Sequence, residues 1–206
     1  MNMVSYMPLF ANPLMQVELD LDLEKLTEFA FEMQDKDIKG VQNTNKGGWH
    51  SENIIEEKHE EFIKLKKEIT QQLQTYHLEI FREMIFKKNI KQALVNIWVN
   101  INGKHHYNEW HIHPMCTLSG AYYIKHDGVE NGNIEFKRPN HLYITDAHWP
   151  QELVEQFNPI TTTHIKFTPK PNMLLIFPSW LEHKVENNLK NDSRISLSFN
   201  SRTILS

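Results

Sequence analysis

The sequence predicts a mainly β protein with α-helices packed against it, and three observations support this fold class. Before about residue 90, apolar residues recur every three or four positions, as in an amphipathic helix. After it, they alternate every second position, as in a strand with one buried face. Turn-forming pairs such as Asn102–Gly103 and Lys170–Pro171 separate the short apolar runs. Many short strands at regular spacing indicate a sandwich, jelly roll or barrel.

The length of 206 residues fits one domain. We expect residues 1–90 to form a mostly helical N-terminal support and residues 91–206 to form the β core. Helices first and strands afterwards are typical of helices packed on one side of a β layer.

Two helices are expected in the N-terminal part. The first covers Leu21 to Met33, with Asp20 or Asp22 as its N-cap. The second runs from Glu56 to about Phe86, and Ser51 is a candidate for its cap. The apolar stripes predicted to face the core are Leu23, Leu26, Phe29 and Phe31 in the first helix, and Phe62, Leu65, Ile69, Leu73, His77 and Ile80 in the second.

Seven strands are expected in the second part, each bounded by turn formers. They are Leu94–Asn102, Glu109–His113, Leu118–His126, Gly132–Phe136, Thr162–Phe167, Met173–Phe177 and Ile195–Ser201.

The composition excludes several classes of protein. A formal charge of −4 gives no general attraction to nucleic acid or to an anionic membrane. A single cysteine, Cys116, excludes an internal disulfide framework. The sequence has neither a signal-peptide pattern nor an apolar run long enough to cross a bilayer, so a cytoplasmic protein is expected. Histidine is unusually frequent, with 12 residues, and it is the commonest metal ligand.

The motif His111-Ile-His113-Pro114 is the sharpest chemical feature. Residues two apart in a strand point to the same face, so His111 and His113 are expected to project together and to chelate one ion. Pro114 favours an extended conformation at the residue before it. A His-x-His pair alone is a weak signal.

Two further pieces lie toward the C-terminus. His183 follows an apolar strand and a turn. Beyond it, the alternation places Arg194, Ser196 and Ser198 on one face of a strand. Burying an arginine without an anionic partner is costly, so either a buried carboxylate or a bound anion must neutralise Arg194. A guanidinium with a nearby hydroxyl suits a carboxylate.

Together these residues describe a three-ligand metal site beside an anion pocket, which is the arrangement of non-haem Fe(II) oxygenases. Five ordered motifs then make the sequence recognisable. It resembles the 2-oxoglutarate/Fe(II) oxygenase family, in particular its bacterial and phage branch, with distant similarity to prolyl hydroxylases. The motifs are His111-Ile-His113-Pro, Leu118-Ser-Gly-Ala-Tyr-Tyr-Ile124, Gly132-Asn-Ile-Glu-Phe136, Pro178-Ser-Trp-Leu-Glu-His183-Lys-Val and Arg194-Ile-Ser-Leu-Ser-Phe-Asn200.

The resemblance implies a double-stranded β-helix, a cupin-like jelly roll, with Fe(II) and 2-oxoglutarate as cofactors. It implies a dioxygenase that hydroxylates its substrate and releases succinate and CO2. It assigns His111, His113 and His183 to the metal, and Arg194, Ser196 and Tyr123 to the far carboxylate of 2-oxoglutarate.

One position departs from the family pattern. Most members carry Asp or Glu where this chain has His113. Two neutral histidines and a carboxylate leave Fe(II) at a formal charge of +1, whereas three histidines leave it at +2. Glu109 is a candidate substitute ligand, because its expected strand position shares a face with His111 and His113, but it ranks below His113.

Two other functions remain open on the sequence. One is a three-histidine zinc lyase or hydrolase, in which the metal would activate water. The other is a jelly-roll binding protein that has lost catalysis. The substrate is expected to be a small molecule or a peptide and not nucleic acid, and a homodimer is left open.

Overall fold

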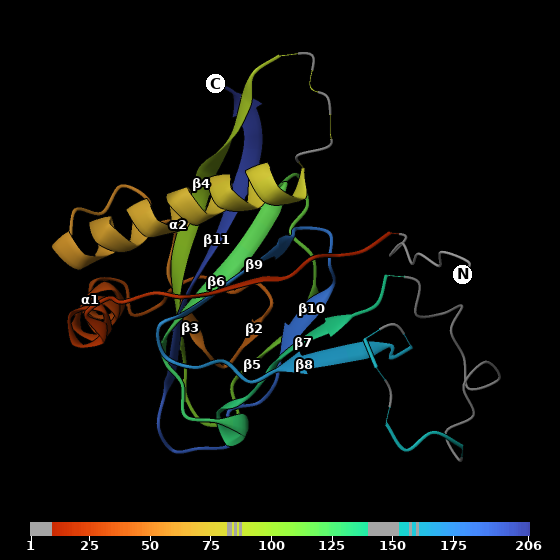
Figure 1. Ribbon diagram of the computed structural model, residues 1–206. Coiled ribbons are helices and arrows are strands. Elements are labelled where there is room, and N and C mark those ends of the chain that lie inside the picture. The colour runs from red at the N-terminus through yellow and green to blue at the C-terminus, as the bar shows by residue number, and fades with distance from the viewer. Residues whose placement is uncertain are drawn as a thin grey trace, which may run out of the picture.

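The protein is a two-sheet β structure with helices on one side (Figure 1). The computed structural model describes residues 10–81, 84, 86, 88–139, 153–156, 158–159 and 161–206. In this part of the chain, one antiparallel sheet has six strands in the order β1-β9-β6-β11-β4-β3, and the other has five in the order β2-β5-β10-β7-β8. This architecture confirms the predicted mainly β class with packed helices and has the two-sheet form of a jelly roll.

The two sheets take their strands from all parts of the described chain. The larger sheet contains β1 Met15–Glu18, β3 Trp49–His50, β4 Ile90–Asn102, β6 Leu118–Lys125, β9 Met173–Pro178 and β11 Arg194–Leu205. The smaller sheet contains β2 Asn45–Lys46, β5 Tyr107–His111, β7 Ile134–Lys137, β8 His164–Phe167 and β10 His183–Val185. A short 3-10 helix, η1, spans Val129–Asn131.

All seven predicted strands are present, with ends that differ by a few residues. The sequence analysis missed β1, β2, β3 and β10, which have two to four residues each and are too short to show a period. One shifted end matters for the site. Strand β5 stops at His111, so His113 lies beyond the strand, where the prediction placed it inside.

The helices α1 Leu23–Lys36 and α2 Glu60–Ile80 are both shifted toward the C-terminus at their start. Asp22 caps α1 as predicted, because its side chain accepts a hydrogen bond from the Lys25 amide. The predicted cap Ser51 is wrong. Its hydroxyl instead accepts a hydrogen bond from the Val99 amide on β4. This bond holds the segment at Ser51 against β4, and α2 begins only at Glu60.

The predicted helical stripes are confirmed except at Phe31 and Ile80, which are exposed. At the end of the predicted second helix, residues 82, 83 and 85 lie outside the described residues. In the described part, α2 ends at Ile80, earlier than predicted. No helix in the described chain is long and apolar enough to cross a membrane.

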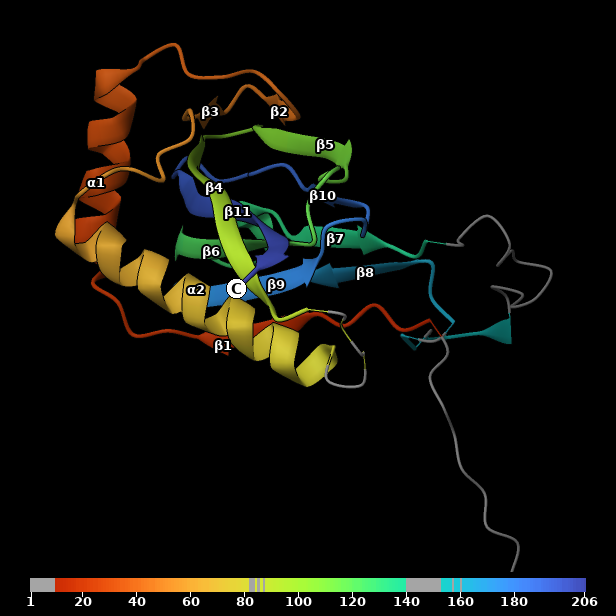
Figure 2. The same ribbon diagram turned by 90° about the horizontal axis from the view of Figure 1, so that it is seen from above.

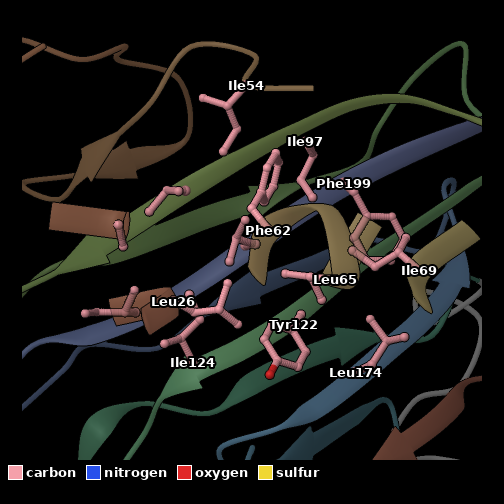
Figure 3. Close-up of a cluster of buried hydrophobic side chains, with 14 of the residues drawn as sticks. Leu26, Ile54, Phe62, Leu65, Ile69, Ile97, Tyr122, Ile124, Leu174 and Phe199 are labelled. Carbon is pink, nitrogen blue, oxygen red and sulfur yellow. The ribbon is translucent and has the colours of Figure 1, made fainter. Parts of the chain in front are cut away.

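The main core fills the space between the helices and the larger sheet (Figure 3). Figure 2, seen from above, shows α1 and α2 on the opposite side of that sheet from β5 and β10. Ile195, Leu197 and Phe199 of β11 are buried in this core, so the predicted two-faced character of the strand is confirmed. The opposite face carries the polar residues and looks toward the smaller sheet. Cross-strand partners from β4 and helix residues complete the cluster: Ile97, Val99, Ile101, Leu26, Phe62 and Leu65.

Candidate metal and 2-oxoglutarate site

A cavity of about 710 Å³ opens between the two sheets. A second apolar cluster, which includes Phe136, Leu175 and Phe177, packs beside it between the sheets. The six predicted site residues come from β5, β6, β10, β11 and the segment after β5, and all of them line this one cavity. They are His111, His113, Tyr123, His183, Arg194 and Ser196.

The three histidines converge. His111, His113 and His183 each offer a ring nitrogen, and these atoms lie within 4.8 Å of one another. The ring centroids of His111 and His183 are 4.3 Å apart, and that of His113 lies 5.0 Å and 5.2 Å from the other two. The group can therefore hold one metal ion without rearrangement of the backbone.

Two different devices bring the rings together. His183 on β10 is the direct antiparallel partner of His111 on β5. His113 is held by a backbone bond from its amide to the Ser179 carbonyl, 2.9 Å away, in the turn after β9. His111 and His113 thus lie together as strand alternation predicts, although a turn contact, and not strand geometry, positions the second histidine.

Backbone carbonyls orient two of the imidazoles. Nδ1 of His111 lies 2.7 Å from the Glu109 carbonyl, and Nδ1 of His183 lies 2.9 Å from the Leu181 carbonyl. These contacts place the proton on Nδ1 and leave Nε2 free to bind a metal. Burial lowers the pKa of all three side chains, that of His113 to about 3, so the rings are neutral at pH 7.

Glu109 does not join this group, which corrects the expectation that it shares the histidine face. Its carboxylate is largely exposed and pairs with the Lys46 ammonium on β2 at 3.2 Å. Within the described residues, the donor set consists of three imidazoles. Neutral imidazole nitrogens suit divalent iron, zinc, copper or nickel.

Arg194 is buried at the first residue of β11, with 1% of its surface exposed. Its Nη1 donates to the carbonyls of Asn131 at 2.6 Å and Glu186 at 3.1 Å. Its Nη2 is buried and has no hydrogen-bond partner, and no acid in the described chain forms an ion pair with the guanidinium. Burial lowers the pKa of Arg194 to about 10, so it is still charged at neutral pH.

An uncompensated guanidinium facing a cavity is the arrangement that a bound anion resolves. Ser196 follows two residues later on the same face of β11 and pairs across the ladder with Tyr123 of β6. Burial raises the pKa of Tyr123, so its phenol remains a neutral donor. Arg194, Ser196 and Tyr123 can therefore present donors to one carboxylate.

The sequence analysis missed the residues that hold Arg194 in place. Asn188 is fully buried and accepts a bond from Asn131 Nδ2 at 2.9 Å. It also donates to the Asn102 carbonyl at 3.0 Å and the Asp192 carbonyl at 2.7 Å. It thereby ties together η1, the end of β4 and the loop before β11. No sequence signal distinguishes Asn188 from the other loop asparagines, because its partners lie far along the chain.

The chain is similar to known proteins in its sequence family and in its fold. A family model described as "Putative 2OG-Fe(II) oxygenase", where 2OG is 2-oxoglutarate, matches residues 96–200. All six residues named above lie inside this range. No curated protein matches the chain.

Solved structures match over nearly the whole chain. A prolyl-4-hydroxylase from Pseudomonas putida has a TM-score of 0.60 at 13% identity, covering 93% of both chains. A viral collagen prolyl hydroxylase from Paramecium bursaria Chlorella virus-1, solved with 2-oxoglutarate, has a TM-score of 0.57 at 13% identity, covering 91% of this chain and 94% of that one. HygX from Streptomyces hygroscopicus, with nickel and 2-oxoglutarate bound, has a TM-score of 0.58 at 10% identity and covers 93% and 83%. These matches confirm the expected jelly-roll fold.

Proposed function

The chain belongs to the putative 2OG-Fe(II) oxygenase family, and we propose that it is a dioxygenase that hydroxylates a small-molecule or peptide substrate. Its cofactors are accordingly Fe(II) and 2-oxoglutarate. When both are bound, they supply oxygen activation, with 2-oxoglutarate converted to succinate and CO2.

One observation carries this proposal. Three convergent neutral imidazoles and a guanidinium with an unpaired Nη2 line the same cavity. The imidazoles suit a divalent transition metal, and the guanidinium suits a carboxylate. A cofactor with one chelating end and one free carboxylate satisfies both groups at once.

The roles proposed for the side chains follow from their chemistry. His111, His113 and His183 would hold the iron, and carbonyl contacts at Nδ1 leave Nε2 of His111 and His183 as the binding atom. Arg194 binds the far carboxylate of 2-oxoglutarate, with Ser196 and Tyr123 as hydroxyl donors. The apolar residues Ala121 and Phe177, which line the same cavity, limit water there.

The third histidine changes the charge of the centre. With no carboxylate ligand, the proposed site keeps the full +2 of Fe(II), so we expect it to favour the dianionic cosubstrate electrostatically. The family membership supports an oxygenase over the zinc lyase or hydrolase, in which Arg194 and Ser196 have no evident role.

The proposal is tested by succinate release. Purified protein with Fe(II) and 2-oxoglutarate should release succinate in air, even slowly without substrate, and should give a visible charge-transfer band under anaerobic conditions. A band without succinate would instead indicate the binding protein that has lost catalysis. No band together with stoichiometric zinc would indicate the zinc enzyme. A cytoplasmic location and a homodimer remain predictions for fractionation and for size measurement in solution.

A further inference from the structure

We propose that the outer half of the cavity binds an uncharged amide of the substrate, as found in a peptide or a peptide-like molecule. This inference rests on the proposed function, because it takes the inner half as the 2-oxoglutarate site. It is carried by the register of the cavity wall, by its charges and by a buried side-chain amide oxygen, Asn96 Oδ1, that has no partner.

The register of β4 and β11 divides the wall into successive pairs. Arg194 faces Asn102 at one end, and Ser198 faces Trp98 further along. The ring of Trp98 lies 5.9 Å from that of His113, so this pair marks the level of the three histidines. The next cavity-facing pair, Asn200 and Asn96, lies roughly 7 Å further from Arg194.

The residues around Asn96 form the outer half of the cavity. They are Ser51, Glu52 and Asn53 after β3, Ile112 and Pro114 beside the histidines, and Asn200. The segment after β3 is fixed on β4 by the bond from the Ile54 amide to the Ile97 carbonyl, at 2.9 Å. This half is therefore built on a sheet edge and can position a substrate relative to the metal.

The charges of the wall argue against an anionic substrate. Among the described residues that line the cavity, Arg194 and Glu52 are those that carry a full charge at neutral pH. Burial lowers the pKa of His50, so this ring is neutral. Once 2-oxoglutarate binds Arg194 and balances the charge of the metal, no cationic side chain on the described wall remains for a phosphate or carboxylate, and the exposed Glu52 repels both.

The outer half is lined by side-chain amides that can form further hydrogen bonds. Asn96 Oδ1 is buried and has no partner. Asn53 Oδ1 accepts from the Ile97 amide at 3.1 Å, and Asn200 Oδ1 accepts from Ser119 at 2.7 Å, which directs their NH2 groups elsewhere. An acceptor without a donor, next to two amide donors, complements a group that offers both N–H and C=O.

The aromatic side chain next to the outer half, Trp98, already stacks on another ring. Trp98 stacks on His50, with ring centroids 5.4 Å apart and planes at 13°, and it also contacts the tilted ring of His113. A nucleobase needs a free aromatic face for stacking. Recognition through amide hydrogen bonds is thus favoured over recognition through stacking.

The experiment uses full-length protein loaded with Zn(II) and 2-oxoglutarate, so that no turnover interferes. The probes are N-acetyl dipeptide N-methylamides, the same dipeptides with a free C-terminal carboxylate, and methyl glucoside, each at millimolar concentration. Side-chain amide resonances are followed by ¹⁵N–¹H spectra, and Asn96→Leu identifies the Asn96 signal. Asn191→Leu, on an exposed loop, is the matched control.

Neutral dipeptides should shift the Asn96 signal and bind at least about tenfold more tightly than their carboxylate forms. Asn96→Leu should lose this binding, while Asn191→Leu should keep it. Equal or tighter binding of the carboxylate forms, a shift with methyl glucoside only, or no shift with any neutral dipeptide overturns the inference. Binding of 2-oxoglutarate and succinate release by the wild type are measured in parallel, and their failure would count against the proposed function instead.

Discussion

His183 lies directly opposite His111 in the antiparallel pairing of β10 and β5, and their ring centroids are 4.3 Å apart. Residues 72 positions apart in the chain thus become neighbours through one short ladder. Both rings bond a backbone carbonyl through Nδ1, so both present Nε2 to the same point. The smaller sheet therefore brings together two of the three candidate ligands.

The first prediction concerns the three histidines. His111→Ala and His183→Ala should each weaken Fe(II) or Co(II) binding by roughly 100-fold or more, since two imidazoles in a cavity make a poor site. Calorimetric titration of the apo-protein measures this. His105→Asn is the control, because His105 is exposed, has φ 67° and lies outside the group. Similar losses in this control would mean that the cluster does not bind the metal.

A second prediction concerns the third histidine alone. His113→Asp should keep metal binding, because a carboxylate is also a good ligand for Fe(II), whereas His113→Ala should lose most of it. Since the bound ion then has a lower net charge, 2-oxoglutarate should bind His113→Asp more weakly than it binds the wild type. Equal loss of metal in both variants would show that the position requires an imidazole.

A third prediction concerns Arg194. Arg194→Lys should lower the affinity for 2-oxoglutarate by at least about 30-fold, which corresponds to roughly 2 kcal/mol, because an ammonium lacks the fork that a buried carboxylate accepts. Titration of protein loaded with Ni(II) measures the affinity for 2-oxoglutarate. The affinity for the metal should stay unchanged. If both affinities fell together, Arg194 would be a structural residue.

Residues within a strongly periodic segment could be predicted from the sequence. Arg194, Ser196 and Ser198 lie on one face as predicted, because the alternate residues on the opposite face are apolar and buried, and burial fixes the register of such a strand. The recognised motifs added His183 and Tyr123, whose places depend on pairings that no period encodes.

The failures have a common physical cause. Ser51, Glu109 and His113 lie where a local pattern competes with a tertiary contact, and the tertiary contact decides the outcome. Asn188 acts through loop contacts, for which distance along the sequence carries no information about distance in space. The residues that hold the site in position were therefore less predictable than the side chains that face the ligand.

A fourth prediction tests how closely the backbone approaches Arg194. Gly132 has φ 92°, and a Cβ there would overlap Arg194 Nη1 and the Glu186 carbonyl. Gly128, at the other end of η1, has φ 76° and open space around it. Gly128→Ala should lower the free energy of unfolding by roughly 1–2 kcal/mol through its positive φ alone. Gly132→Ala should lower it by roughly 1–3 kcal/mol more and should weaken 2-oxoglutarate binding.

Denaturant unfolding and 2-oxoglutarate titration of the two alanine variants separate these effects. Both alanine variants carry the cost of a positive φ. The difference in their free energies of unfolding therefore measures the contact between a Cβ at position 132 and the guanidinium. If Gly128→Ala and Gly132→Ala lost the same stability and kept the same 2-oxoglutarate affinity, the backbone at Gly132 would be able to shift without displacing Arg194.

The last prediction concerns Asn188, which ties the loop that carries Asn131 to the Asn102 and Asp192 carbonyls. Asn188→Ala removes these bonds, so the Asn131 carbonyl that accepts from Arg194 is no longer held. The affinity for 2-oxoglutarate should fall by about tenfold, while metal affinity stays the same, because the histidines belong to other elements. Gln92→Leu is the matched control. It removes a buried amide that bonds Ser201 and Thr203 but does not line the cavity, so it should cost similar stability without changing 2-oxoglutarate binding. A parallel loss of affinity in both variants would reduce the role of Asn188 to general stability, and a loss only in Asn188→Ala would establish it as the positioning residue for Arg194.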